Sequence, residues 1–443
     1  MKIQLSDHFT YSKLFRFTLP SIAMMVFTSI YGVVDGYFVS NFAGKTAFAA
    51  INLIMPFVMV LGGMGFMIGT GGTALVSKVL GQRDKATANR YFSMMIELTL
   101  LLGILLGVLG VVFMEPVARF LKATDEMMAD CVLYGRIVTG FTVTFMLQNV
   151  FQSFLIAAEK PKLGLIATIA AGVTNMVLDA LFVGVFRWGV AGAAVATGLS
   201  QCVGGVFPLI YFLRPNSSLL RFRPARLEWK PILRACANGS SELMSNVSSS
   251  LVSILYNFQL LRYYGENGVS AYGVLMYVQF IFIAIFVGYS IGCAPVVGFH
   301  YGAENHGELK NMLGKSVLLM GIGGIVLTAL AQGLAEPLAH IFVGYDAELY
   351  ALTVHAFRLF SFTFLLAGFN IFSSSFFTAL NNGGVSAAIS FLRTLVFQCA
   401  CILILPELIK VDGIWWSNFI AEIGSFLVSL LFLLGMRKKY RYF

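Results

Sequence analysis

The sequence predicts an all-α polytopic membrane protein with twelve transmembrane helices arranged as two parallel six-helix repeats. Three observations predict it: an apolar composition, recurring apolar runs and an internal repeat. Of 443 residues, 58% are hydrophobic and 12% are charged, whereas about 25% charged residues is usual in a soluble domain. A helix of about 20 apolar residues can cross the hydrocarbon core of a bilayer, and apolar runs of such length recur from one end of the chain to the other.

The apolar runs define the expected spans and leave no room for a soluble domain. The start of the chain lacks the regions of a cleaved signal peptide, so we expect the first span to remain in the mature protein. The twelve expected spans cover residues 15–40, 48–73, 91–114, 131–157, 163–186, 190–213, 235–260, 269–296, 313–335, 350–378, 385–406 and 413–436.

Short similar segments recur in the same order in both halves, at a nearly constant separation along the chain. GKTAFAAINLIMPF from Gly44 resembles GENGVSAYGVLMYVQF from Gly265, GFMIG resembles GYSIG, and GVAGAAVAT resembles GIWWSNFIA. Six spans per half give both copies the same orientation, as in transporters that bind substrate between or within the halves. The expected domains are a lobe over 1–213, a linker over 214–234 and a lobe over 235–443.

The distribution of positive charge predicts the topology. Most of the 30 Lys and Arg residues fall before the first span, after the last one and in every second connection, with Arg393 counted on the same side. This bias places both termini in the cytoplasm. The basic linker is then a cytoplasmic tether that could touch anionic lipid, and no nucleic-acid partner is expected.

Two carboxylates interrupt apolar spans, Asp35 in SIYGVVDGYFVS and Asp179 in NMVLD. An acid near the bilayer centre costs several kcal/mol, so it usually faces a cavity or a partner and indicates function. At 1.5 Å per residue, Asp35 lies about 28 Å beyond Arg16 and Asp179 about 25 Å beyond Lys162. The two acids therefore have similar depths in the outer half of the first lobe and could share one site. Across the repeat, Asp35 falls opposite Asn257.

Each acid has a polar neighbour one helical turn earlier, Tyr31 before Asp35 and Asn175 before Asp179. Oxygen ligands of this kind suit a hard cation such as sodium. The same pair could instead take a proton, because burial and a second carboxylate both favour the protonated acid. The residues therefore predict a site for a coupling cation and leave its identity open.

The chain resembles the multidrug and toxic compound extrusion (MATE) family, closest to its DinF-like and MepA-like bacterial branch. The likeness rests on LP at 19–20 with an aspartate fifteen residues later, GTGGTALVSKVLGQRD after the second span, NMVLD, and GVAGAAVAT in the sixth span. It covers essentially the whole chain. It implies two six-helix bundles that form a V and export organic cations and other amphiphiles in exchange for sodium ions or protons.

The resemblance also implies site residues. Thr197 joins Asp35, Asn175 and Asp179 around a possible sodium ion, and Asn149 and Gln152 are assigned to the substrate cavity. Thr197 and Asn149 could instead only hydrogen-bond neighbouring helices. In the family, the helix that carries Pro20 is proposed to bend; a static kink or a first-turn proline is the alternative.

Four further charged side chains in the spans keep open roles, namely Glu242, Glu422, His355 and Arg358. Glu242 could pair with Arg234, line an inner gate or reach the interface. His355 and Arg358 could pair with acids at the outer mouth such as Asp346.

These features predict a monomeric secondary exporter in the bacterial cytoplasmic (inner) membrane. It is not expected to be an enzyme or to need a cofactor beyond its coupling ion, and its partners would be small cationic or amphiphilic substrates and membrane lipids. One alternative is a lipid-linked precursor flippase, but such proteins commonly carry several basic residues in the central cavity and the mid-span positions here offer almost none. A more remote alternative is a membrane-embedded enzyme, which needs a clustered catalytic set, whereas most of the histidines fall at loops or span ends.

Overall fold

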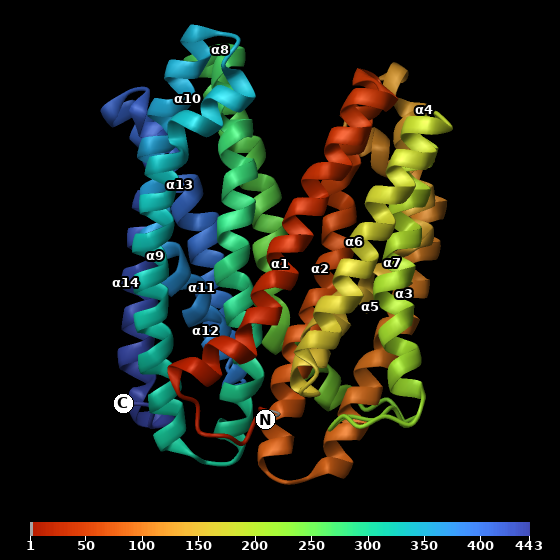
Figure 1. Cartoon of the computed structure of the whole chain (residues 1–443), viewed down its shortest axis with the longest axis vertical. Helices are drawn as coiled ribbons and strands as arrows, with labels where there is room; N and C mark the ends of the chain where they lie inside the picture. The colour runs from red at the N-terminus through yellow and green to blue at the C-terminus, as the bar shows by residue number, and fades with distance from the viewer. Residues whose placement is uncertain (1–2) are drawn as a thin grey trace.

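The computed structural model describes residues 3–443, apart from the side chains of Lys45 and Glu266, and within those residues the regular structure is entirely helical. Figure 1 shows two helical bundles side by side. They lie close together at the end that carries both termini and diverge towards the opposite end. The expected V of two bundles is therefore present. We call them the first and second bundles.

The first bundle contains seven helices that make six passes. α4 and α5 are the two halves of one pass, bent by 55°. π-helical turns extend α1 (η1, Val39–Ala43) and α6 (η2, Ala180–Val185). The helices are α1 (Tyr11–Phe38), α2 (Lys45–Gly81), α3 (Lys85–Phe120), α4 (Asp125–Gly140), α5 (Thr142–Ala157), α6 (Pro161–Asp179) and α7 (Gly189–Leu213).

The second bundle begins with α8 (Trp229–Gly302), which is two passes joined at Gly265. Gly265 has a φ of 62°, and its repeat mate Gly44 has a φ of 96° at the corresponding turn; positive φ is accessible to glycine at little steric cost. The remaining elements are α9 (His306–Val343), α10 (Ala347–Phe360), η3 (Ser361–Thr363), α11 (Phe364–Ala379), α12 (Gly383–Phe391), η4 (Leu392–Phe397), α13 (Gln398–Ile409) and α14 (Asp412–Tyr440).

The number of passes agrees with the sequence prediction. Within residues 3–443, ten helices are long and apolar enough to cross a membrane, and the bent α4–α5 pair makes an eleventh. The twelfth pass is the part of α8 before Gly265, which contains the serine-rich stretch NGSSELMSNVSSS and is therefore less apolar. The predicted all-α fold with two groups of six passes is confirmed.

Several helices extend beyond the apolar runs because polar caps start them outside the expected spans. The Asp84 side chain accepts from the Thr87 N–H to start α3, and Asn305 accepts from the Glu308 N–H to start α9. Such caps satisfy backbone donors that the helix itself leaves free. α8 also begins ahead of the expected start at 235, at Trp229, but without a side-chain cap.

Glycines bring the two bundles into backbone contact near the end with the termini. A Cβ on Gly81 of α2 would lie 2.0 Å from the carbonyl oxygen of Phe299 in α8, and a Cβ on Gly302 would lie 1.9 Å from that of Lys78. Gly81 and Gly302 are as far apart in the chain as the turn glycines Gly44 and Gly265, so they occupy equivalent positions in the two repeats and make reciprocal contacts. The bundles are therefore related by an approximate two-fold rotation, as parallel repeats require.

A second pair of glycines corrects one repeat assignment. α1 meets the second half of α8 at Gly292, and the first half of α8 meets α2 at Gly71. Gly71 and Gly292 have the same separation as Gly81 and Gly302, and at this separation Asp35 is matched by Tyr256 and not by Asn257.

The surroundings of the two candidates agree with the corrected match. Tyr256 is buried and lines a cavity of the second bundle, whereas Asn257 is exposed. Sequence similarity alone was too weak here to fix the alignment to one residue.

The linker between the bundles is an irregular segment that lies along α3. Its backbone N–H groups at 221, 223 and 225 donate to side chains of Asn89, Ser93 and Glu97. These three acceptors are four residues apart and therefore share one helix face. The polar face at the start of α3, including Glu97, thus serves to hold the linker against the first bundle.

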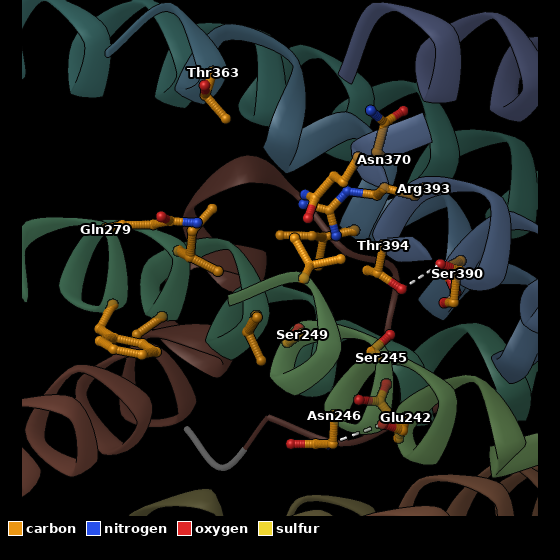
Figure 2. A pocket seen from close by; sticks show the side chains of 18 of the residues that line it. Glu242, Ser245, Asn246, Ser249, Gln279, Thr363, Asn370, Ser390, Arg393 and Thr394 are labelled. Atoms are coloured by element: carbon orange, nitrogen blue, oxygen red, sulfur yellow. Dashed lines mark hydrogen bonds between the residues drawn. The ribbon is translucent and has the colours of Figure 1, made fainter. Parts of the chain in front are cut away.

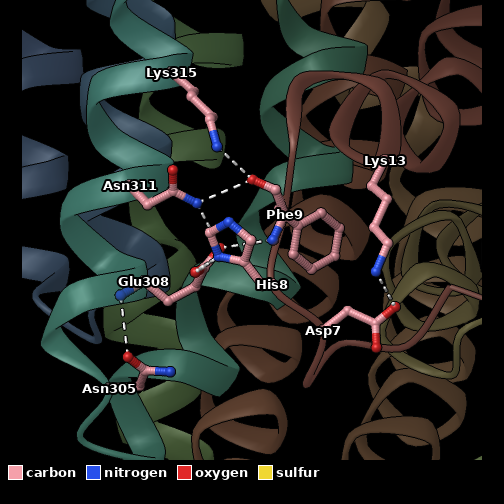
Figure 3. Close-up of polar contacts among 8 residues, drawn as sticks. All are labelled: Asp7, His8, Phe9, Lys13, Asn305, Glu308, Asn311 and Lys315. Carbon is pink, nitrogen blue, oxygen red and sulfur yellow. Dashed lines mark hydrogen bonds and ion pairs between the residues drawn. The ribbon is translucent and has the colours of Figure 1, made fainter.

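The N-terminal segment lies at the end that carries the termini, near the junction of the two bundles (Figure 1), and it hydrogen-bonds to each of them. The Leu5 N–H donates to Glu159, at the end of α5 in the first bundle, over 2.8 Å. Glu308 of α9 accepts from the Phe9 N–H at 2.9 Å and contacts the His8 ring at 2.7 Å (Figure 3). We call residues 3–9 the N-terminal strap.

Replacing Gly302 by alanine should destabilise the contact between the bundles. The added Cβ would overlap the Lys78 carbonyl, and overpacking typically costs about 1–3 kcal/mol. Thermal unfolding in detergent would measure this. The control is Gly314→Ala on α9, where a Cβ meets nothing within 4 Å; equal melting temperatures for the two variants would contradict the assignment.

Glu308→Ala should release the N-terminal strap. The Phe9 N–H loses a carboxylate partner, so its hydrogen exchange should rise by about 10- to 100-fold, as expected for a hydrogen bond to a charged group. Exchange measured by mass spectrometry on residues 3–10 would show the change. Lys310→Ala, at an exposed position on the same helix, should leave the exchange unaltered; unchanged protection in Glu308→Ala would show that the strap is held by other contacts.

Candidate functional site

Close packing of α1 on α6 brings the two acidic spans together. A Cβ on Gly172 of α6 would lie 2.4 Å from the Phe27 ring and 2.7 Å from the Tyr31 ring, so only glycine allows both aromatic rings of α1 to pack here. Asn175 and Asp179 follow on the same face of α6, one and two turns later.

The carboxyl groups of Asp35 and Asp179 lie within hydrogen-bonding range of each other, and Asp35 is also within range of the Asn175 side chain. Asp179 is fully buried and Asn175 is 2% exposed. No group among the described residues donates a hydrogen bond to Asp35 Oδ1 or to either oxygen of Asp179. The structure thus places together the two acids that the sequence paired.

Two tyrosines and a glutamine extend this site. Tyr31 lies within hydrogen-bonding range of Gln148 on α5. Tyr134 on α4 is buried and lies within electrostatic range of both Asp35 and Asp179. The sequence analysis missed Gln148 and Tyr134. The polar Gln148 inside an apolar span was an available signal, whereas nothing in the sequence distinguishes Tyr134 from other span tyrosines.

Thr197 lies on α7, which packs beside α6. Its hydroxyl oxygen is buried and makes no hydrogen bond among the described residues, so it does not bond directly to either acid. The π-helical turn η2 begins directly after Asp179, and such turns are frequent at functional sites. In residues 3–443, no three His, Cys, Asp or Glu side chains gather to hold a metal ion.

Pro20 lies inside α1, well after the helix begins at Tyr11, which excludes a first-turn position. It is buried where α1 packs on α8, because neighbouring Ser21 and Ile22 contact Gly288. The helix therefore lacks one backbone hydrogen bond at the contact between the bundles.

Asn149 and Gln152, which the resemblance assigned to a substrate cavity, are buried inside the first bundle. Asn149 donates to the Gly62 carbonyl of α2 over 3.0 Å. Gln152 borders a void large enough for about one water molecule, and its carbonyl oxygen is unpaired. Neither residue lines the large cavity described next.

The second bundle contains a cavity of about 430 Å³, within the usual size range of ligand pockets. Its wall comes mainly from both halves of α8, from α11 and from α12 to α14, and α1 contributes Met25 and Ser29. Figure 2 shows Arg393 beside Asn370, and Glu242 beside Asn246 at a separate place on the wall. The polar serine-rich half of α8 is thus explained by the cavity it faces.

An ion pair lies inside this cavity. Arg393 Nη2 is 2.7 Å from Glu422 Oε1, and Arg393 Nε donates to both carboxylate oxygens. Glu422 also accepts from the Asn370 amide at 2.6 Å. The assignment of Arg393 to the cytoplasmic side was therefore wrong: η4 carries it into the bundle, where a buried charge needs its partner.

The structure also locates the other charged residues whose roles the sequence left open. Glu242 lines the cavity. His355 contacts Asp412 at 2.8 Å and Arg358 contacts Glu336 at 2.6 Å. Both residues therefore pair with acids, as expected, but Asp346, the example given, is not the partner of either. Asp346 instead caps α10 through the N–H groups at 348 and 349. Both exposed pairs tie helices at the end away from the termini.

Comparison with known proteins agrees with this geometry. The MatE family model matches the chain twice, at residues 20–181 and 243–402, once in each bundle. A multidrug export protein MepA of Staphylococcus saprophyticus is 24% identical over 99% of this chain and 98% of its own length, and one from Staphylococcus aureus is 22% identical over 97% and 94%. A crystal structure of a MATE protein in complex with MaL6 superimposes with a TM-score of 0.89 at 22% identity, over 96% of each chain.

Proposed function

Because this chain belongs to the MatE family of multidrug and toxic compound extrusion transporters, which are not enzymes, we propose that it exports organic cations and amphiphilic drugs by cation-coupled antiport. The coupling ion is a proton or sodium. The observation that carries the proposal is the Asp35–Asp179 pair, in which Asp179 is fully buried and Asp35 is partly buried. Asp35 Oδ1 and both Asp179 oxygens receive no hydrogen bond from the described residues.

The coupling site consists of Asp35 and Asp179, with Asn175, Tyr31 and Thr197 around them. Two unpaired carboxylates in contact repel each other, so a proton shared between them or a sodium ion bound to both stabilises the pair. The Asn175 amide and the Tyr31 hydroxyl supply further polar groups at the site. Ion release would leave two buried negative charges together, and this change in free energy can drive a conformational change.

α1 is suited to transmit that change. It carries Asp35 in the first bundle, contacts α8 of the second bundle near Pro20, and lines the large cavity through Met25 and Ser29. A local change at Asp35 therefore acts on a helix of the first bundle that also contacts the second bundle. We propose that the bundles alternate between access from the two sides, with the present arrangement open away from the termini.

One feature of the cavity supports the flippase alternative, and another opposes it. Arg393 is a basic residue inside the cavity, which the sequence analysis did not expect. It is compensated by Glu422, and Glu242 leaves the charged wall residues with one excess carboxyl group. A cavity of this charge favours cationic groups over the phosphate of a lipid-linked precursor.

Asp35→Asn should abolish the coupling of export to the ion gradient, because asparagine keeps the shape of the side chain but removes its charge. In proteoliposomes with an imposed pH or sodium gradient, uphill export of a fluorescent cation should fall by about tenfold or more, in the range of typical coupling free energies. Asp179→Asn should act alike, and the double variant should be little worse, because the two groups act as one unit.

The matched control for this experiment is Asp125→Asn, an exposed acid at the start of α4, which should transport normally. Uphill transport by well-folded Asp35→Asn at the rate of the unmodified protein would overturn the coupling role.

The proposed location is the bacterial cytoplasmic membrane with both termini inside the cell. A cysteine placed at exposed position 226 of the linker should react with an impermeant thiol reagent only after the cells are opened. A cysteine at position 345, where Tyr345 is 83% exposed at the other end, should react in intact cells. The chain with only its six native cysteines is the background control, and the reverse labelling pattern would overturn the topology.

A further inference from the structure

Glu242 and Arg393 lie at different depths in the cavity of the second bundle. Gly383 of α12 lies against Ala237 and Asn238 of α8, so the two helices are level at that point. At 1.5 Å per residue, Glu242 then lies about 7 Å and Arg393 about 15 Å further from the end with the termini. The backbone positions of the two residues are therefore separated by about 8 Å along the bundle axis, from the same helical rise.

Arg393 does not use its whole guanidinium group for the ion pair. Nε and Nη2 donate to Glu422, and the Nη1 hydrogens make no hydrogen bond among the described residues. Both residues line the cavity, but the Glu422 side chain is only 2% exposed, whereas the Arg393 side chain is 16% exposed. One edge of the guanidinium is thus free to donate to a bound molecule.

Buried acceptors around the cavity also lack partners. Asn370 and Asn418 are 0% and 3% exposed, and the side-chain carbonyl oxygens of Asn370, Asn418 and Gln279 receive no hydrogen bond among the described residues. All three residues line the cavity. Unpaired buried acceptors are costly, so a ligand that brings N–H donors would relieve them.

The rest of the wall combines aromatic and apolar side chains with the hydroxyl groups of serines and threonines. Tyr256 and Tyr272 stack face to face with ring centroids 5.1 Å apart, and Phe66 and Phe280 complete this surface. Flat aromatic ligands bury well against such rings. The cavity thus combines one aromatic wall with two separate charged positions.

We propose that this cavity binds zwitterionic amphiphiles, with the amine directed towards Glu242 and a carboxylate bound to the free edge of Arg393. Arg393 is then a specificity-determining residue that selects substrates carrying an anionic acceptor in addition to a positive charge. The inference rests on the proposed export function, because it names the substrate class of the same transporter.

The charge balance explains why a zwitterion fits best. A purely anionic ligand would compete with Glu422 for Arg393 and leave Glu242 without a partner. A purely cationic ligand would satisfy Glu242 and leave the guanidinium edge without an acceptor. Sites built to hydrogen-bond a substrate group discriminate strongly against analogues that lack it.

Rhodamine B and its ethyl ester test the proposal, because they share one cationic chromophore and differ only in whether the carboxylate is free. Binding of each probe to the full-length protein in lipid nanodiscs is measured by fluorescence polarisation. The double variant Arg393→Gln/Glu422→Gln removes the ion pair without leaving an isolated buried charge. Its affinity for rhodamine B should fall by about ten- to a hundredfold, while its affinity for the ester changes less than about twofold.

The control Arg358→Gln removes an exposed arginine from an ion pair of the same bundle and should leave both affinities unchanged. Glu242→Gln should weaken both probes, since both are cations. An equal loss of both probes in the double variant would show a structural role for the pair, and no loss of either would show that Arg393 does not contact the ligand; both outcomes overturn the proposal.

Gradient-driven transport, measured separately in proteoliposomes, distinguishes this inference from the proposed function. Transport that persists while the double variant keeps its preference for rhodamine B contradicts only the role of Arg393. A carboxylate preference that depends on Arg393, in a protein that moves no substrate under any gradient, contradicts the export function and leaves the binding site in place.

Discussion

A charge inside the hydrocarbon core is tolerated only where protein surrounds it, and this constraint organises the molecule. It explains why Asp35 and Asp179 face each other across the packed surface of α1 and α6, and why Arg393 lies against Glu422. The first bundle therefore encloses these two acids, and the second encloses the Arg393–Glu422 pair with Glu242 on the same cavity wall, while many side chains on the outer faces of the helices are apolar. Glycine makes these pairs possible, because close helix packing brings side chains of separate spans within reach.

The two bundles share a frame and differ in chemistry. One repeat spacing relates the bundle contacts at Gly81 and Gly302 as well as the turns at Gly44 and Gly265. Within this frame the first bundle holds two acids and little empty space, whereas the second holds a compensated ion pair beside a large cavity. In the proposed function, ion binding and substrate binding are therefore assigned to different bundles, and the contacts between the bundles would carry the coupling.

Those contacts lie at the end that bears the termini. α2 approaches both halves of α8 at backbone distance, and the N-terminal strap joins Glu159 of the first bundle to Glu308 of the second. The opposite ends have no comparable backbone contact between the bundles in the described residues and diverge (Figure 1). α1 is the helix that carries a coupling acid, the interior proline and part of the cavity wall together, so it links the site to this closed end.

The sequence by itself determined the helical fold and the repeat, and it placed Asp35 and Asp179 at similar depths, because apolar run length and residue depth follow directly from helix geometry. It did not determine which residues meet across helices. Arg393 was placed outside the membrane, the particular acids that pair with His355 and Arg358 were not identified, and Tyr134 was overlooked, since helix rotation and the packing partner are absent from a single sequence. The cavity is likewise a product of tertiary structure: its wall combines helices from α1 to α14, far apart in the chain, and only their packing decides which polar side chains converge on it.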